Sequence, residues 1–148
     1  MNLTAMNPES FKIYAICAAL LALNLVVLSG MTGGARGKNK SPANPEDAGK
    51  PADTALEPEA PAVVRVRRAH MNALENIPIF WALGLVFVLL GASPLGAKAY
   101  FITFTAARYL HSFFHLKAMQ PFRSIAYGIG ALCLVGMIVQ VLMVAFRA

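Results

Sequence analysis

Charged residues are scarce in this sequence. Asp, Glu, Lys and Arg make up 14% of its 148 residues, whereas 57% are hydrophobic. An ordinary soluble domain is about a quarter charged. Residues 13–35, 76–97 and 124–146 contain no charged side chain. Each is long enough to cross a hydrocarbon core of about 30 Å, which takes roughly 20 residues of helix. The composition argues against a soluble domain and predicts an integral membrane protein with a single domain, residues 1–148.

Cysteine is also rare. Cys17 and Cys133 lie inside apolar stretches and form neither a CxxC motif, nor a zinc-ligand spacing, nor a disulfide framework. We therefore expect both to be small packing residues. His111 and His115 have the i, i+4 spacing of a helical metal-binding pair, but an HExxH motif and a third ligand are missing. No metal site is predicted.

The segment before the first apolar stretch lacks the basic residues that open a cleaved signal peptide. Residues 1–12 contain one Glu and one Lys, and the apolar stretch that follows is longer than a typical signal-peptide core. This stretch is predicted to remain in the protein as a transmembrane helix.

Acidic residues are outnumbered by basic ones, 7 to 13, which gives a net charge of +6. The basic residues flank apolar stretches, so membrane orientation explains them better than nucleic-acid binding does. With the amino terminus outside, three basic residues face outwards and nine face the cytoplasm: Arg36, Lys38, Lys40, Lys50, Arg65, Arg67, Arg68, Lys117 and Arg123. Both termini are therefore predicted to be non-cytoplasmic. A bacterial inner membrane and an endoplasmic reticulum membrane fit equally well.

The pattern of apolar residues predicts four helices. Their expected ranges are about 11–31, 63–90, 96–117 and 122–146. Residues 32–62 are rich in Gly, Pro and charges of both signs and are expected to form a polar cytoplasmic loop. The expected fold is an all-α integral membrane protein, a bundle of four transmembrane helices.

Polar residues interrupt these helices at helical spacing. The second helix carries Arg65, Arg68, Asn72 and Glu75, which are 3, 4 and 3 residues apart, and the third carries Arg108, His111 and His115, which are 3 and 4 apart. Each of these two sets therefore lies on one face of its helix. The fourth helix adds Arg123, Ser124 and Tyr127 near its start. Polar groups within a membrane normally face protein or a water-filled cavity. Together they predict a cationic pocket that binds a small anionic or zwitterionic ligand from the cytoplasmic side.

Simpler interpretations stay open for several of these residues. The arginines at 65, 67 and 68 could form a juxtamembrane cluster that touches anionic lipid. Asn72 and Glu75 could supply hydrogen bonds between helices, and Glu75 could form an ion pair with Arg108. Arg123 could anchor its helix at the interface, and Ser124 could cap it.

One run of residues resembles a known signature. Residues 65–76, RVRRAHMNALEN, are similar to the ERxxRAHxNxxE pattern of the MAPEG family, the membrane-associated proteins in eicosanoid and glutathione metabolism. The resemblance extends to residues 43–47, 107–111 and 121–124, in the same order and spacing. It is strongest to the branch of microsomal glutathione transferases and prostaglandin E synthases.

The resemblance implies a homotrimer of four-helix protomers that binds glutathione between neighbouring subunits. The matching glutathione-binding positions are Arg36, Arg68, Asn72, Glu75, His111 and Tyr127. The matching catalytic positions are Arg123 and Ser124, which would hold the glutathione thiolate; Asp47 and His115 would be helpers and Arg108 structural.

The implied activity is that of a membrane-bound glutathione transferase with glutathione peroxidase activity. Glutathione would be the cosubstrate, a lipophilic electrophile or hydroperoxide the second substrate, and membrane lipid a further partner. Alternatives are a non-catalytic lipid-binding scaffold, a small channel or transporter subunit, and a prostaglandin E synthase-like isomerase. Met71 and His115 depart from the residues of that isomerase branch, an arginine and a tyrosine, which weighs against the isomerase.

Overall fold

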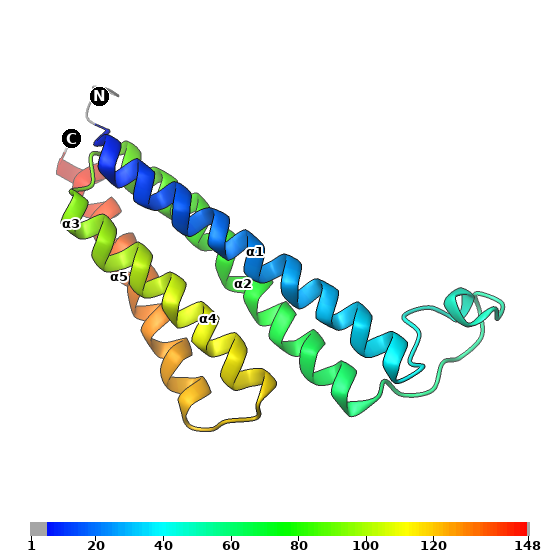
Figure 1. The fold of residues 1–148 in the computed structure, drawn as a ribbon. Coiled ribbons are helices and arrows are strands. Elements are labelled where there is room, and N and C mark those ends of the chain that lie inside the picture. The colour runs from blue at the N-terminus through cyan, green and yellow to red at the C-terminus, as the bar shows by residue number, and fades with distance from the viewer. Residues whose placement is uncertain (1–5, 148) are drawn as a thin grey trace.

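The computed structural model describes residues 6–147 and consists of helices joined by one long loop and two short turns (Figure 1). The long helices are α1 (Pro8–Lys38), α2 (Pro61–Leu89) and α5 (Phe122–Arg147). A further pass combines α3 (Pro94–Ala97), the π-helical turn Lys98–Ile102 and α4 (Thr103–Leu116). No strand occurs among the residues described, so the all-α prediction is confirmed.

The helices form two hairpins that pack against each other. Figure 1 shows α1 beside α2, and α4 beside α5, while α2 also contacts both helices of the second hairpin. The amino- and carboxyl-terminal ends lie together at one end of the bundle (Figure 1). The loop of residues 39–60 and the turn of residues 117–121 lie towards the opposite end, called the loop end below.

Three of the helices, α1, α2 and α5, are long and apolar enough to cross a membrane. The pass from residue 94 to 116 is not among them, because the π-helical turn divides it and Arg108, His111 and His115 make it more polar. A fourth transmembrane span therefore stays a prediction.

The first helix is longer than the sequence pattern indicated. α1 runs from Pro8 to Lys38, so residues 32–38 are helical and the prediction that the loop begins at residue 32 is wrong. The hydroxyl of Thr32 donates to the Leu28 carbonyl at 2.8 Å. Asn39 caps the end by donating its side-chain amide to the Ala35 carbonyl at 2.8 Å. Arg36 and Lys38 in the last turn also favour the helix, since cations interact well with its carboxyl end.

Within the loop, residues 45–48 form one turn of 3₁₀ helix. The Asp47 carboxylate accepts from the backbone N–H of Asn44 at 3.0 Å, which ties the start of the turn down. α2 then begins at Pro61, a favoured residue at the first position of a helix because its missing N–H would be unpaired there anyway.

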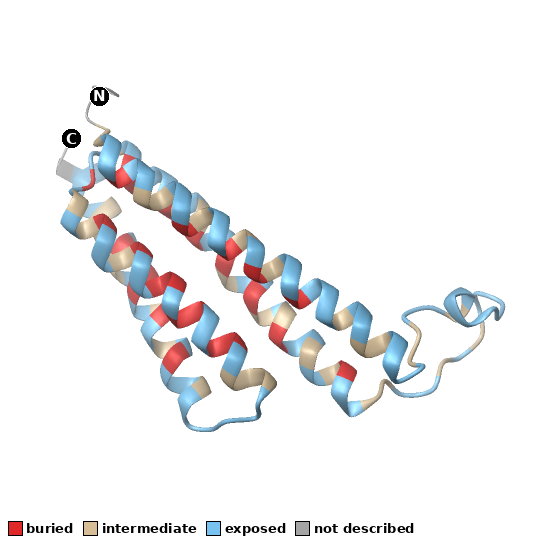
Figure 2. Cartoon of the chain, viewed as in Figure 1, coloured by how far each residue is buried: buried red, intermediate tan, exposed pale blue. Residues whose placement is uncertain are grey.

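Aromatic rings fill the core towards the terminal end of the bundle. Phe80 stacks on Phe104 with ring centroids 4.7 Å apart, and Phe101 meets Phe80 edge to face at 5.4 Å. Figure 2 shows that the buried residues follow the inward sides of the helices. Cys17 and Cys133 are buried in this core and form no disulfide with each other, which confirms that they are packing residues.

Gly136 on α5 packs closely against the ring of Tyr100 in the π-helical turn. A Cβ at this position would lie 2.6 Å from the Tyr100 ring, and that ring is held by a 2.8 Å hydrogen bond from Gln140 to its hydroxyl. We expect Gly136→Ala to lower the free energy of unfolding in detergent by about 1–3 kcal/mol, as overpacking usually does. Gly130→Ala is the matched control, because its Cβ would meet only ordinary contacts at 3.7 Å and beyond. Equal thermal stability of the two variants would contradict this prediction.

Candidate functional site

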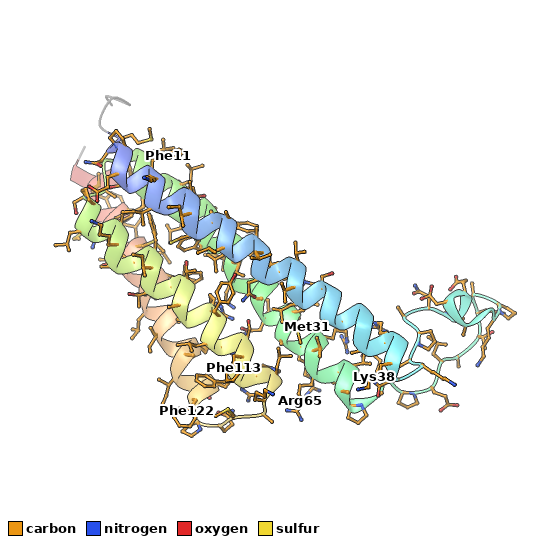
Figure 3. The ribbon with its side chains drawn as sticks, in the orientation of Figure 1. Phe11, Met31, Lys38, Arg65, Phe113 and Phe122 are labelled. Atoms are coloured by element: carbon orange, nitrogen blue, oxygen red, sulfur yellow. The ribbon has the colours of Figure 1, made fainter. Side chains whose placement is uncertain are left out.

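A cationic hollow of about 420 Å³ opens at the loop end between α2, α4 and α5. Arg65 and Arg68 line it from α2, one turn apart, together with His115 from the end of α4 and Arg123 from the start of α5. Figure 3 shows Arg65 at the same end of the bundle as Lys38 and Phe122. The structure thus brings together basic residues from three helices, as the polar stripes predicted, and we call this hollow the arginine pocket.

A buried polar cluster lies on the same three helices, within the bundle. Arg108 is only 1% exposed; its Nη2 donates to the side-chain oxygen of Asn72 and lies 3.2 Å from Nδ1 of His111. The His111 ring is 5.8 Å from the ring of His115 and 6.0 Å from that of Tyr127. His115 also lines the arginine pocket, so it connects the pocket to the buried cluster.

Arg108 makes no ion pair with any residue in the range 6–147. The Nε and Nη1 atoms of its guanidinium have no hydrogen-bond partner there. Glu75, the ion-pair partner that the sequence allowed, is exposed instead, so that interpretation is wrong for the isolated chain. Asn72 takes its place because it lies three residues earlier on α2 and its amide oxygen faces the guanidinium.

Arg123 and Ser124 are joined through a residue that the sequence did not single out. The side-chain amide of Gln120 lies 3.1 Å from the Ser124 hydroxyl. With its oxygen turned towards Arg123, this amide also accepts hydrogen bonds from Nη2 and Nε of the guanidinium. Gln120 therefore orients both residues. It precedes a helix and belongs to no periodic pattern, so no sequence pattern pointed to it.

Glu59, at the end of the loop, is the second residue that the sequence analysis missed. Its carboxylate accepts from Nη2 of Arg36 at 2.5 Å and from Nε of Arg67 at 2.8 Å, and its side chain lines the arginine pocket. Partial burial tends to raise the pKa of the Glu59 carboxyl, but the hydrogen bonds and positive charges of Arg67 and Arg36 hold that pKa below its usual value. Both ion pairs are therefore intact at neutral pH and weaken only as the pH falls through the lowered pKa. The available signal in the sequence was the position of this acidic residue shortly before the three arginines at 65, 67 and 68, which allows an ion pair with one of them.

The remaining predicted residues lie outside the arginine pocket. Glu75, Ser124 and Tyr127 are exposed on the surface of the single chain. Asp47 caps the 3₁₀ turn and shares a separate hollow of about 410 Å³ with Arg36. In the part of the chain that the structure describes, no three His, Cys, Asp or Glu side chains are grouped so that they could hold a metal ion.

Known proteins share this sequence pattern. The family model described as MAPEG family matches residues 14–143, most of the chain. The chain belongs to the MAPEG family. This MAPEG protein is 35% identical to prostaglandin E synthase of Bos taurus over 147 residues, which cover 99% of this chain and 96% of the relative. It is 34% identical to prostaglandin E synthase of Homo sapiens over 143 residues, 96% and 94% of the two chains.

A relative with a different name is equally similar to this MAPEG protein. Microsomal glutathione S-transferase 1 of Homo sapiens is 35% identical over 131 residues, with 84% of each chain covered. The resemblance noted in the sequence is therefore confirmed at the level of the family, and identity alone does not separate the two groups of relatives. With its three long apolar helices, the chain is a membrane protein.

Proposed function

We propose that this MAPEG protein is a membrane-bound glutathione transferase that binds glutathione at the arginine pocket and activates it as the thiolate. The observation that carries this proposal is the pocket itself, in which Arg65, Arg68 and Arg123 converge at one end of the bundle. Glutathione has two carboxylates, and the guanidinium fork of arginine pairs bidentately with such groups. The names of the relatives, glutathione S-transferase and prostaglandin E synthase, fit the same chemistry.

The glutathione-binding residues are distributed between the pocket, the buried polar cluster next to it and the exposed surface. In this proposal they are Arg36, Arg68, Asn72, Glu75, His111 and Tyr127, with Asp47 and His115 as helpers. Glu75, Ser124 and Tyr127 are exposed in the single chain, which leaves them free to face a neighbouring protomer. We therefore propose a homotrimer in which adjacent protomers complete the site. Arg108 has the structural role of joining α4 to α2 through Asn72.

The chemistry required of the protein is deprotonation of a thiol. A free alkyl thiol has a pKa of about 8.5 and is mostly protonated at neutral pH, while the thiolate is the nucleophile. A cation within about 4–6 Å lowers such a pKa by roughly one to three units. Arg123 supplies this charge, and the Ser124 hydroxyl donates a hydrogen bond to the sulfur. The protein contributes activation and proximity, and glutathione contributes the reacting atom.

The second substrate is a lipophilic electrophile or a hydroperoxide dissolved in the membrane. An apolar groove of about 350 Å³ between α4 and α5 includes Phe122 and Ile125, the neighbours of Arg123 and Ser124 in sequence. Such a groove supports access from the lipid side. In the proposed topology the pass of residues 94–116 is the fourth span, the loop end faces the cytoplasm and both termini face the other side, in a bacterial inner membrane or the endoplasmic reticulum.

A prostaglandin E synthase-like isomerase is the second candidate, because several relatives carry that name. Met71, which departs from the arginine of that branch, is 49% exposed on α2, so a longer charged side chain can be accommodated. We expect Met71→Arg to raise isomerase activity relative to glutathione conjugation. The test compares the two activities in one preparation, with Met71→Gln as a polar control without charge. An unchanged ratio would show that position 71 does not set substrate preference.

The experiment that tests the proposed function is a thiolate difference spectrum of the detergent-solubilised protein titrated with glutathione. A saturable thiolate signal is the expected result. Binding without the signal, seen by calorimetry, would show that glutathione is held but not activated. No binding to a folded protein would favour the lipid-binding scaffold instead.

A further inference from the structure

Glu59 occupies groups that a bound carboxylate would need. Its two carboxylate oxygens bind two arginines from different helices, Arg36 at the end of α1 and Arg67 in the second turn of α2. The same carboxylate borders the arginine pocket beside Arg65 and Arg68. The loop end therefore already contains an internal anion.

The hydrogen bonds of Arg36 limit what else it can bind. Its Nη2 donates to Glu59 at 2.5 Å, and its Nη1 donates to the backbone carbonyl of Ser41 at 3.5 Å. A carboxylate bound bidentately needs two parallel N–H groups of one guanidinium. A ligand carboxylate that pairs with Nη1 and Nη2 of Arg36 therefore competes there with Glu59 and with the Ser41 carbonyl.

The segment that holds Glu59 is attached weakly enough to move. Both ion pairs of Glu59 are partly exposed: the exposed fraction of the side chain is 21% for Arg36, 23% for Glu59 and 47% for Arg67. Beyond these pairs, the loop is tied to the end of α1 by a long 3.4 Å hydrogen bond from the Ala60 N–H to the Ser41 hydroxyl. Ion pairs that water reaches contribute little to stability. A ligand that brings its own carboxylate can therefore replace Glu59.

We propose that Glu59 is an affinity-setting residue that competes with the carboxylate of glutathione for Arg36 and for the positive field of the arginine pocket. This inference rests on the proposed function, because it concerns the same site. In the ligand-free protein Glu59 closes the link between α1, the loop and α2. When glutathione binds, its carboxylate takes the place of that of Glu59, and the segment carrying Glu59 is released. The apparent Kd equals the intrinsic Kd divided by the fraction of molecules in which the arginines are free of Glu59, so the contact weakens glutathione binding.

The direction of the effect distinguishes competition from a supporting role. Glu59→Gln removes the competing charge but keeps the size of the side chain, so the Kd for glutathione is expected to fall by about two- to thirtyfold, the range that two partly exposed ion pairs would give. If Glu59 instead positions Arg36 for the ligand or binds the ammonium group of glutathione, the same substitution raises the Kd. An unchanged Kd would also overturn the proposal.

Glu57→Gln is the matched control. It removes the same charge two residues earlier in the loop, where Glu57 is exposed and lines a different hollow. Its effect on the Kd is expected to be less than half that of Glu59→Gln. Equal effects would mean that only the net charge of the loop matters, and would contradict a specific contact.

Two further measurements separate this proposal from the proposed function. Hydrogen exchange of residues 39–60 without ligand is expected to be faster in Glu59→Gln than in the wild type, and unchanged exchange would show that the contact does not hold the loop.

Glutarate, a dicarboxylate without a thiol, is used beside glutathione as a second ligand, and it should also bind more tightly to Glu59→Gln than to the wild type. Tighter glutarate binding without any glutathione thiolate would overturn the proposed function alone. Failure of both probes to bind either protein would overturn both.

Discussion

Replacing Arg123 by alanine is expected to remove the thiolate signal of bound glutathione at neutral pH and to lower turnover by about 10- to 100-fold. Without the guanidinium, the thiol returns towards its free pKa of about 8.5, at which only about 3% is ionised at pH 7. The measurement is the thiolate difference spectrum at saturating glutathione, together with the rate of conjugation of a lipophilic electrophile. Raising the pH should restore part of the thiolate signal in the variant, because the thiol then ionises unaided.

Lys117→Ala is the control for this experiment. Lys117 is an exposed cation in the turn before α5 and does not line the arginine pocket, so its loss changes the net charge equally without touching the site. Wild-type turnover in Arg123→Ala would show that Arg123 has been assigned wrongly. The oligomeric state of both variants should equal that of the wild type.

The second large effect is expected from Asn72, the side-chain amide that accepts from the buried Arg108. Asn72→Leu leaves the guanidinium in an apolar interior with only His111 beside it, and removing the hydrogen-bond partner of a buried charged group costs about 3 kcal/mol or more. Arg108→Met removes the charge and fills similar space, so it should cost only about 1–3 kcal/mol for the Asn72 oxygen left unpaired. Thermal unfolding in detergent without glutathione measures both changes.

The double variant completes this test. Asn72→Leu combined with Arg108→Met removes both partners, and we expect it to be more stable than Asn72→Leu alone, since neither an unpaired guanidinium nor an unpaired Asn72 oxygen remains. Asn76→Leu is the control on the same helix, because the Asn76 side chain bonds only to the Asn72 carbonyl of its own helix. If Asn72→Leu were no more destabilising than Asn76→Leu, Arg108 would not depend on Asn72.

The helices themselves could be predicted well from local pattern, with errors at their ends and at the π-helical turn Lys98–Ile102, which divides the pass expected as one helix over about 96–117. The second helix was expected from about residue 63 and begins at Pro61, and the last begins at Phe122 as expected. The main error was at the end of α1, where glycines and charges in residues 32–38 suggested a loop. The helix continues there despite the weak helix propensity of glycine, and the Asn39 side chain caps its end at the Ala35 carbonyl.

The polar stripes also predicted most of the residues that line the arginine pocket, but not which side chains contact one another. Periodicity places Arg65 and Arg68 on one face of α2, and the third and fourth helices each bring one further basic side chain to the arginine pocket, His115 and Arg123. Periodicity cannot say which side chain of one helix meets which of another. The sequence offered Glu75 as the partner of Arg108, and the structure instead gives Asn72.

The sequence by itself determined that this chain is a helical membrane protein of the MAPEG family with a basic end, because charge-free stretches, helical spacing and a signature run are all local properties. Only the tertiary structure decided that Glu59 bridges Arg36 and Arg67, that Gln120 joins Arg123 to Ser124, and that Arg108 is buried against an amide. These contacts join residues in loops and turns to helices, or one helix to another. Their geometry follows from how the loop and the turn fold back onto the helices and from how the two hairpins pack, which no periodic pattern in the chain encodes.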